Sequence, residues 1–176
     1  MALRRWRPGD AAALAAAWAD PEIGRHASVP AGPPAEAAAR WIGGAGLRAA
    51  TGVSVDLVVG PPDGDEVWGE VGVARLRLRV PTGGAGPPER VVWDTGWWAA
   101  AAHRRRGVAT AAVRLLVGWA AGEAGLVPLV ARIPPGHRAS EAVAARAGFA
   151  RRGRWDATHD LWLRPDPTPG PGRGAV

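Results

Sequence analysis

The stretch HRRRGVATAAV, residues 103–113, contains the turn around which the fold is arranged. Residues 90–99 before it read as a strand, and residues 107–121 carry apolar side chains at helical spacing. Backbone N–H groups at the start of a helix lack partners, and the helix dipole adds positive charge there. Gly107 and Ala109 would let a ligand approach this backbone closely. The turn therefore predicts an anion-binding site.

Alternating apolar patterns and Gly or Pro breaks divide the rest of the chain into short elements. In the predicted strand over residues 67–80, the change from Val71 and Val73 to Leu76 and Leu78 indicates a bulge. The other predicted strands cover residues 3–7, 53–59, 90–99, 126–133, 150–154 and 158–163, and the predicted helices cover residues 11–19, 35–47, 107–121 and 138–147.

This order, β-α-α-β-β-β-α-β-α-β with the last strand doubled into a pair, is typical of a single α+β domain. An antiparallel meander in the middle and β-α-β crossovers after it predict a mixed central sheet flanked by helices. We assign the domain to residues 1–164 and expect the Pro- and Gly-rich residues 165–176 to form a disordered tail.

Composition excludes several classes of protein. The 176 residues include no cysteine, so neither a disulfide framework nor a thiolate nucleophile is expected. The chain has no apolar run long enough to span a membrane, and its first residues, MALRRWRPGD, lack the apolar core of a signal peptide, so we expect a cytoplasmic protein. The net charge is +6, but the arginines are scattered apart from residues 104–106 and 151–154, which disfavours nucleic-acid binding.

Two familiar phosphate loops do not fit the sequence. A P-loop requires a lysine, and this chain contains none. The glycines of residues 44–49 come at the end of a predicted helix, whereas a dinucleotide-binding loop follows a strand.

Residues 94–149 resemble the GNAT superfamily of N-acetyltransferases, and in particular its ribosomal-protein (Rim-like) branch. The resemblance rests on four elements in order: a strand, the turn R-x-x-G-x-A at residues 104–109, an amphipathic helix, and a strand followed by S-x-x-V-x-x-x-A-G-F at residues 140–149. It extends more weakly over most of residues 3–163. It implies transfer of acetyl from acetyl-CoA to a primary amine, either a protein N-terminus or a small molecule, without a metal. Homodimers are common among such proteins, and the sequence leaves the oligomeric state open.

The resemblance also implies where the co-substrate lies. The pyrophosphate would rest on the backbone N–H groups of Arg105, Arg106, Gly107, Val108, Ala109 and Thr110. Arg104 matches the Gln/Arg position of the family turn. The pantetheine arm would run beside Trp97, Trp98 and Ala99, where a strand N–H could polarise the thioester carbonyl. Ser140 matches a family position near the cofactor, and His137 stands where relatives commonly have an asparagine.

Acetyl transfer requires a neutral amine and a proton for the departing thiolate. Asp94 matches a family carboxylate and is our first candidate for the base, and Glu70 is the second. The chain contains no tyrosine to serve as general acid, so Ser140, or solvent, would supply the proton. Without a cysteine, direct attack by the amine in a ternary complex is the simpler mechanism.

Structural roles remain alternatives for each of these side chains. Asp94 could instead pair with an arginine, Glu70 could be structural, and Ser140 and His137 could cap a helix. The loops at residues 25–34, which include His26, and 81–88 are expected to shape the acceptor pocket. The missing tyrosine and asparagine leave one rival function, a non-catalytic module that binds or senses acyl-CoA.

Overall fold

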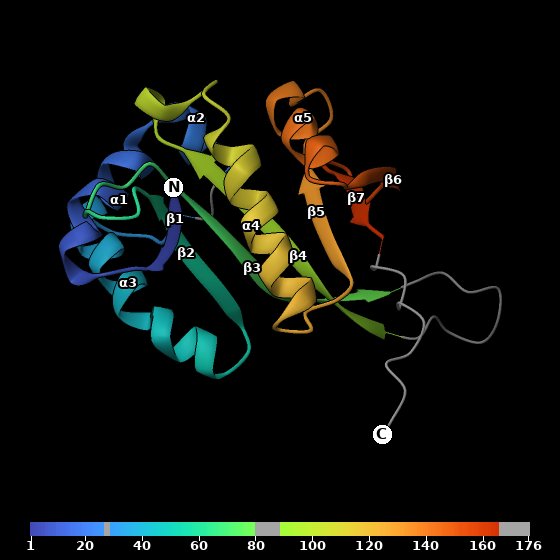
Figure 1. Ribbon diagram of the computed structural model, residues 1–176, viewed down its shortest axis with the longest axis horizontal. Coiled ribbons are helices and arrows are strands. Elements are labelled where there is room, and N and C mark those ends of the chain that lie inside the picture. Colours follow the sequence, from blue (N-terminus) through green and yellow to red (C-terminus); the bar gives the residue numbers. More distant parts are fainter. Residues whose placement is uncertain (27–28, 80–88, 166–176) are drawn as a thin grey trace.

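Seven strands form one mixed sheet in the order β1-β2-β3-β4-β5-β7-β6 (Figure 1). The computed structural model describes residues 1–26, 29–79 and 89–165. Strands β1 to β4 pair antiparallel, β4 and β5 pair parallel, and β7 pairs antiparallel with both β5 and β6. The strands are β1 (Ala2–Arg5), β2 (Ser54–Gly60), β3 (Gly69–Arg79), β4 (Glu89–Ala99), β5 (Leu129–Ile133), β6 (Ala150–Arg154) and β7 (Asp160–Arg164).

Helices cover the two faces of the sheet unequally (Figure 1). On one face lie α1 (Ala11–Ala19), α2 (Pro21–Gly24) and α3 (Pro34–Ala50), and on the other lie α4 (Val108–Gly122) and α5 (Arg138–Arg146). Two short 3-10 helices, η1 (Pro8–Asp10) and η2 (Ala101–His103), precede α1 and α4. Among the described residues, no helix has the length and apolar character that crossing a membrane would require.

The strand alternation builds a separate core on each face. Val71 and Val73 of β3 point toward α4, where they pack with Leu116 in the larger core. Their neighbour Glu70 points to the opposite face, as does Trp98, its partner on β4. There a smaller core joins Leu14 of α1 to the helix α3 and to the sheet.

The predicted α+β fold and its order of main elements are confirmed, with two corrections. No helix was predicted between residues 19 and 35, but Asp20 accepts a hydrogen bond from the Glu22 N–H and starts the one-turn helix α2. The bulge predicted in β3 is wrong, because β3 pairs with β4 without a register shift. Leu76 simply lies on the opposite face from Val71 and Val73. Residues 166–176, nearly all of the expected tail, lie outside the described residues.

The strands β4 and β5 separate at one end, and this gap positions the site. Their pairing consists of Trp93 with Leu129 and Asp94 with Val130, although both strands continue beyond these pairs. The Trp93 N–H donates to the Pro128 carbonyl, so the odd-numbered backbone groups of β4 point toward β5. Consequently the N–H groups of Trp97 and Ala99 face the gap.

Candidate active site

The turn before α4 presents a row of free backbone donors. Arg105 and Gly107 adopt left-handed conformations, with φ of 56° and 79°. In the described part of the chain, no acceptor pairs with the N–H groups of residues 105–110, and the first bond of the helix runs from the Ala111 N–H to the Gly107 carbonyl. A Cβ added at Gly107 would meet no atom within 4 Å, so the backbone here is open to a ligand. Free donors at the start of a 15-residue helix make this turn suited to an anion.

The three arginines of the turn do not act alike. The Arg104 guanidinium turns away from the free N–H groups, donating to the Asp20 carboxylate at 2.6 Å and to the Ala99 carbonyl at 3.0 Å. Arg106 is exposed and donates to the Ala102 carbonyl at 3.3 Å. A hollow of about 330 Å³ borders the turn at Arg106, Gly107 and Val108. Backbone groups, rather than Arg104, therefore face an incoming anion.

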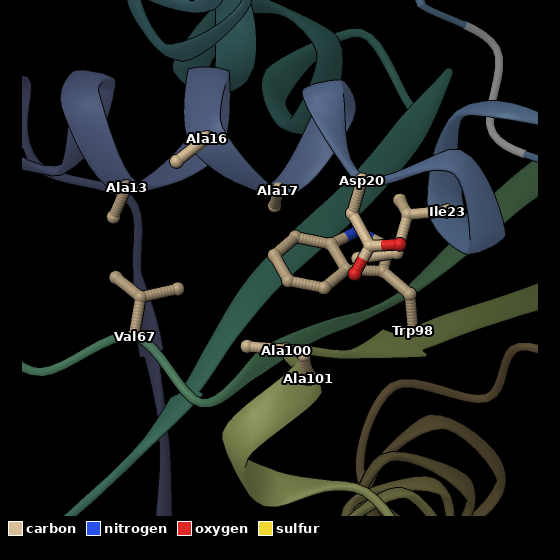
Figure 2. Close-up of a pocket in the computed structure, with 9 residues that line it drawn as sticks. All are labelled: Ala13, Ala16, Ala17, Asp20, Ile23, Val67, Trp98, Ala100 and Ala101. Carbon is tan, nitrogen blue, oxygen red and sulfur yellow. The ribbon is translucent and has the colours of Figure 1, made fainter.

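Trp97 and Trp98 point to opposite faces of β4. Trp97 packs against the core beneath α4. Trp98 lies under α1, where it lines a mostly apolar pocket of about 190 Å³ together with three alanines of that helix (Figure 2). Figure 2 also shows the Asp20 carboxylate at the edge of this pocket, in front of the Trp98 ring. The two adjacent tryptophans thus separate the α4 core from the α1 side of the sheet.

Asp94 lies where β4 and β5 begin to separate. Its Oδ2 accepts a hydrogen bond from Arg132 Nε of β5 at 2.9 Å and forms an ion pair with the terminal nitrogen of Arg132 at 2.8 Å. Its Oδ1 is buried and has no hydrogen-bond partner. Burial raises the pKa of Asp94, and Arg132 only partly opposes that effect. The carboxylate is therefore held through Oδ2, while Oδ1 is unpartnered but enclosed by the protein.

Glu70 lies on the same face of the sheet but in different surroundings. Burial, together with the charge of Asp56, raises the pKa of Glu70 to about 8, against the opposing effects of Trp98 and Arg48. Glu70 is the register partner of Trp98, whereas Asp94 lies four residues back along β4. At about 3.3 Å per residue, the two backbone positions are roughly 13 Å apart along the strands. The two carboxylates therefore do not form a pair.

A bare patch of sheet separates Asp94 from Glu70. Gly96 of β4 is paired with Gly72 of β3, which is buried, with Asp56 Oδ1 3.1 Å from the place of an added Cβ, so only Gly96 is open. Gly96 is exposed although β4 is an inner strand, and a Cβ built there would meet nothing within 4 Å. This exposed floor at Gly96, two residues from Asp94 along β4, has room for a small substrate group.

Ser140 and His137 lie together at the start of α5. The His137 ring caps the helix, its Nδ1 accepting the Ser140 N–H at 3.3 Å. The same ring contacts His26, with centroids 4.6 Å apart, and its Nε2 lies 3.9 Å from a Glu22 carboxylate oxygen. Burial is the main cause that lowers the pKa of His26. These contacts bring α2 and α5 together across the end of the gap between the strands.

Some residues of the site carry no strong sequence signal. Arg132 sits in a predicted strand, but its pairing with Asp94 joins positions far apart in the chain. The partnership of Asp20 with Arg104 spans 84 residues. The sequence placed Gly96 only within the predicted strand over residues 90–99 and gave no sign that it is exposed. The predicted loop at residues 81–88 lies outside the described residues, as do residues 27 and 28.

Comparison with known protein families matches residues 1–150 to the acetyltransferase (GNAT) domain. The chain belongs to the GNAT acetyltransferase family. The family resemblance predicted from residues 94–149 is confirmed, and with it the class of enzyme, an acetyl-CoA-dependent acetyltransferase. No curated protein matches the sequence.

Solved structures of GNAT enzymes share the fold at low sequence identity. The ribosomal-protein-S5-alanine acetyltransferase from Vibrio fischeri superposes with a TM-score of 0.69 at 17% identity, covering 93% of this chain and 92% of its own. RimJ from Mycobacterium smegmatis, in complex with CoA-disulfide, gives 0.67 at 23%, covering 92% and 78%. AAC(6')-Ib, in complex with paromomycin and acetyl-CoA, gives 0.69 at 16%, covering 92% and 91%. Ribosomal-protein acetyltransferases are thus among the proteins that this fold resembles.

Proposed function

We propose that this GNAT enzyme transfers acetyl from acetyl-CoA to a primary amine by direct attack in a ternary complex. The observation that carries the proposal is the alignment of two features along β4. Free N–H groups at residues 105–110 lie beyond one end of the strand gap, and the unpartnered Asp94 Oδ1 lies at the other. The five steps along the strand from Asp94 to Ala99 span about 16 Å, which suits an extended thioester arm between them.

In this arrangement, each part of acetyl-CoA has a complementary surface. The pyrophosphate takes the N–H groups of residues 105–110, with Arg105 and Arg106 adding charge at the rim. The pantetheine lies in the gap, where the N–H groups of Trp97 and Ala99 can pair with its amides and polarise the thioester carbonyl. Ser140 and His137, at the end of the gap beside α5, are the remaining contacts. No metal ion takes part in the proposed reaction.

Asp94 is the proposed base. Its Oδ1 is buried in the free protein and accepts a proton from the ammonium of the acceptor once acceptor binding uncovers it, while Arg132 fixes Oδ2. The amine nitrogen then bonds to the thioester carbon, and the C–S bond breaks as the carbonyl re-forms. The thiolate of CoA leaves and takes a proton from the Ser140 hydroxyl or from solvent, and the proton that the nitrogen loses as the amide forms replaces it. Glu70 is a weaker candidate, because a carboxyl with a pKa of about 8 is mostly protonated at neutral pH.

The acceptor would approach over Gly96, from the face of the sheet that α1 and α2 border. The names of the structural neighbours include acetyltransferases for a ribosomal protein and one crystallised with an aminoglycoside. Both a protein N-terminus and a small-molecule amine therefore remain acceptors to be tried.

An acceptor screen tests the function directly. The full chain is incubated with acetyl-CoA and with N-terminal peptides, polyamines or aminoglycosides, and free CoA is measured by a thiol reagent, which the cysteine-free chain does not consume. We expect amine-dependent CoA release with at least one class. In parallel, saturating acetyl-CoA should raise the melting temperature. A thermal shift without turnover on any amine would indicate an acyl-CoA-binding module, and the absence of both would contradict the whole proposal.

A further inference from the structure

Asp20 occupies the junction between α1 and α2 and is fixed there by the main chain. Its N–H donates to the Ala17 carbonyl, and its own carbonyl accepts from Ile23 and Gly24. One carboxylate oxygen, Oδ1, accepts the Glu22 N–H at 2.9 Å and so caps α2. The other oxygen, Oδ2, is committed to Arg104 at 2.6 Å.

Arg104 connects this junction to the cofactor turn. Its Nε–H donates to the carbonyl of Ala99, the last residue of β4, while its terminal nitrogen reaches Asp20. Both side chains are largely shielded from solvent, with 30% of the Arg104 side chain and 21% of the Asp20 side chain exposed. We call this Asp20–Arg104 ion pair the clamp. The residue after Arg104 is the strained, left-handed Arg105, so the clamp holds the chain directly before the free N–H groups.

The apolar pocket shows why this contact matters. It separates α1 from Ala100 and Ala101, and small side chains line most of it (Figure 2). Packing alone therefore leaves a void between α1 and the segment that leads into the turn. The ion pair between Asp20 and Arg104, at the edge of this void, connects α1 to the segment that leads into the turn.

We propose that Asp20 is a positioning residue that acts through Arg104: it holds the turn in the conformation that presents the N–H groups of residues 105–110. This inference rests on the proposed binding of acetyl-CoA at that turn. The same contact links co-substrate binding to α1 and α2, which lie on the face of the sheet from which the acceptor would approach Gly96.

Asp20→Asn is the test, because asparagine is itself a good helix cap and can still accept the Glu22 N–H. It removes the charge that holds Arg104. We expect the Kd for CoA, measured by calorimetry on the full chain, and the KM for acetyl-CoA to rise about threefold to tenfold, as for a partly shielded ion pair. The kcat and the melting temperature without ligand should stay near the wild-type values, which separates positioning from a general loss of stability.

A double-mutant cycle with Arg104→Gln makes the test specific to the pair. If Asp20 acts through Arg104, adding Asp20→Asn to Arg104→Gln should change the Kd for CoA by less than about twofold. The matched control is Arg106→Gln, which removes one positive charge from the same turn but touches no part of the clamp. Its effect should add to that of Asp20→Asn.

The outcomes separate the two proposals. Should the wild-type chain bind CoA and Asp20→Asn bind it equally well or more tightly, the clamp is wrong and the proposed function stands. Full additivity with Arg104→Gln would likewise overturn the clamp, because Asp20 would then act elsewhere. If the wild-type chain binds neither CoA nor acetyl-CoA, the proposed function fails and the clamp, as a device for cofactor binding, fails with it.

Discussion

Two proposed parts of the site are built in different ways: the turn proposed to bind the co-substrate lies beyond the end of β4, and the proposed acceptor floor lies at Gly96 within that strand. The turn, residues 104–110, is made of main-chain donors from one continuous segment. The floor at Gly96 is bordered by side chains of β3, β4 and β5, among them Glu70, Asp94 and Arg132. A site made of backbone depends on conformation, whereas a site made of side chains depends on tertiary pairing. Substitutions in the two parts should therefore separate co-substrate binding from acceptor chemistry.

The largest effect is expected at the turn. Gly107→Glu places a carboxylate beside the free N–H groups and forces a non-glycine residue to a φ of 79°. We expect the Kd for acetyl-CoA to rise about 100-fold or more, since both charge and geometry oppose the pyrophosphate. Calorimetry or the thermal shift measures it. Gly107→Ala is the matched control for the strain and should weaken binding by only about tenfold. Undiminished binding by Gly107→Glu would show that the anion lies elsewhere.

Asp94→Asn should impair the reaction with the acceptor but not the binding of CoA. An asparagine can keep a bond from Arg132 but takes up no proton, so kcat should fall about 100-fold while the Kd for CoA stays within twofold. The wild-type enzyme should also show a pH dependence, because burial raises the pKa of Asp94. Turnover should rise as pH increases through that raised pKa, at a higher pH than the ordinary aspartate value of about 4. An unchanged kcat in the variant would remove Asp94 from the mechanism.

A graded effect is expected at the floor. Gly96→Ala and Gly96→Val add side chains where no atom lies within 4 Å, so the fold should be kept. Turnover should fall about threefold and then about tenfold as the side chain grows, with the KM for the acceptor rising and CoA binding unaffected. Gly118→Ala, on α4, also meets no neighbour and serves as the control, with turnover unchanged. Equal turnover across the series would mean that the acceptor does not cross Gly96.

The smallest effect on catalysis is expected at Glu70. Glu70→Gln resembles the protonated carboxyl, so turnover at neutral pH should change less than about twofold. Stability should respond instead. The unfolded carboxyl loses its proton near its ordinary pKa, but the folded one keeps it to about pH 8, so the wild type loses stability as pH rises between these values. The variant should escape that loss and gain roughly 1–3 kcal/mol relative to wild type at pH 8, measured by urea unfolding. A large fall in kcat would make Glu70 the base.

Local patterns predicted the elements well because each depends on neighbours in sequence. The strand, turn and helix around Gly107 follow from alternation, glycine placement and helical spacing. Prediction from local patterns missed α2, because the segment Asp20-Pro21-Glu22 both ends α1 and starts α2. It also placed a bulge at Leu76, although an apolar residue on the second face of an inner strand needs none when helices border both faces.

The sequence by itself determined the fold class, the family and the backbone turn, since these depend on the order of short motifs and on glycine at Gly107. Tertiary structure alone decided which charges meet: Asp94 with Arg132, and Asp20 with Arg104. It also decided that Gly96 lies bare on an inner strand. The physical reason is that conformational preferences act over a few residues, whereas charge pairing and exposure are set by strand register and helix packing between distant segments.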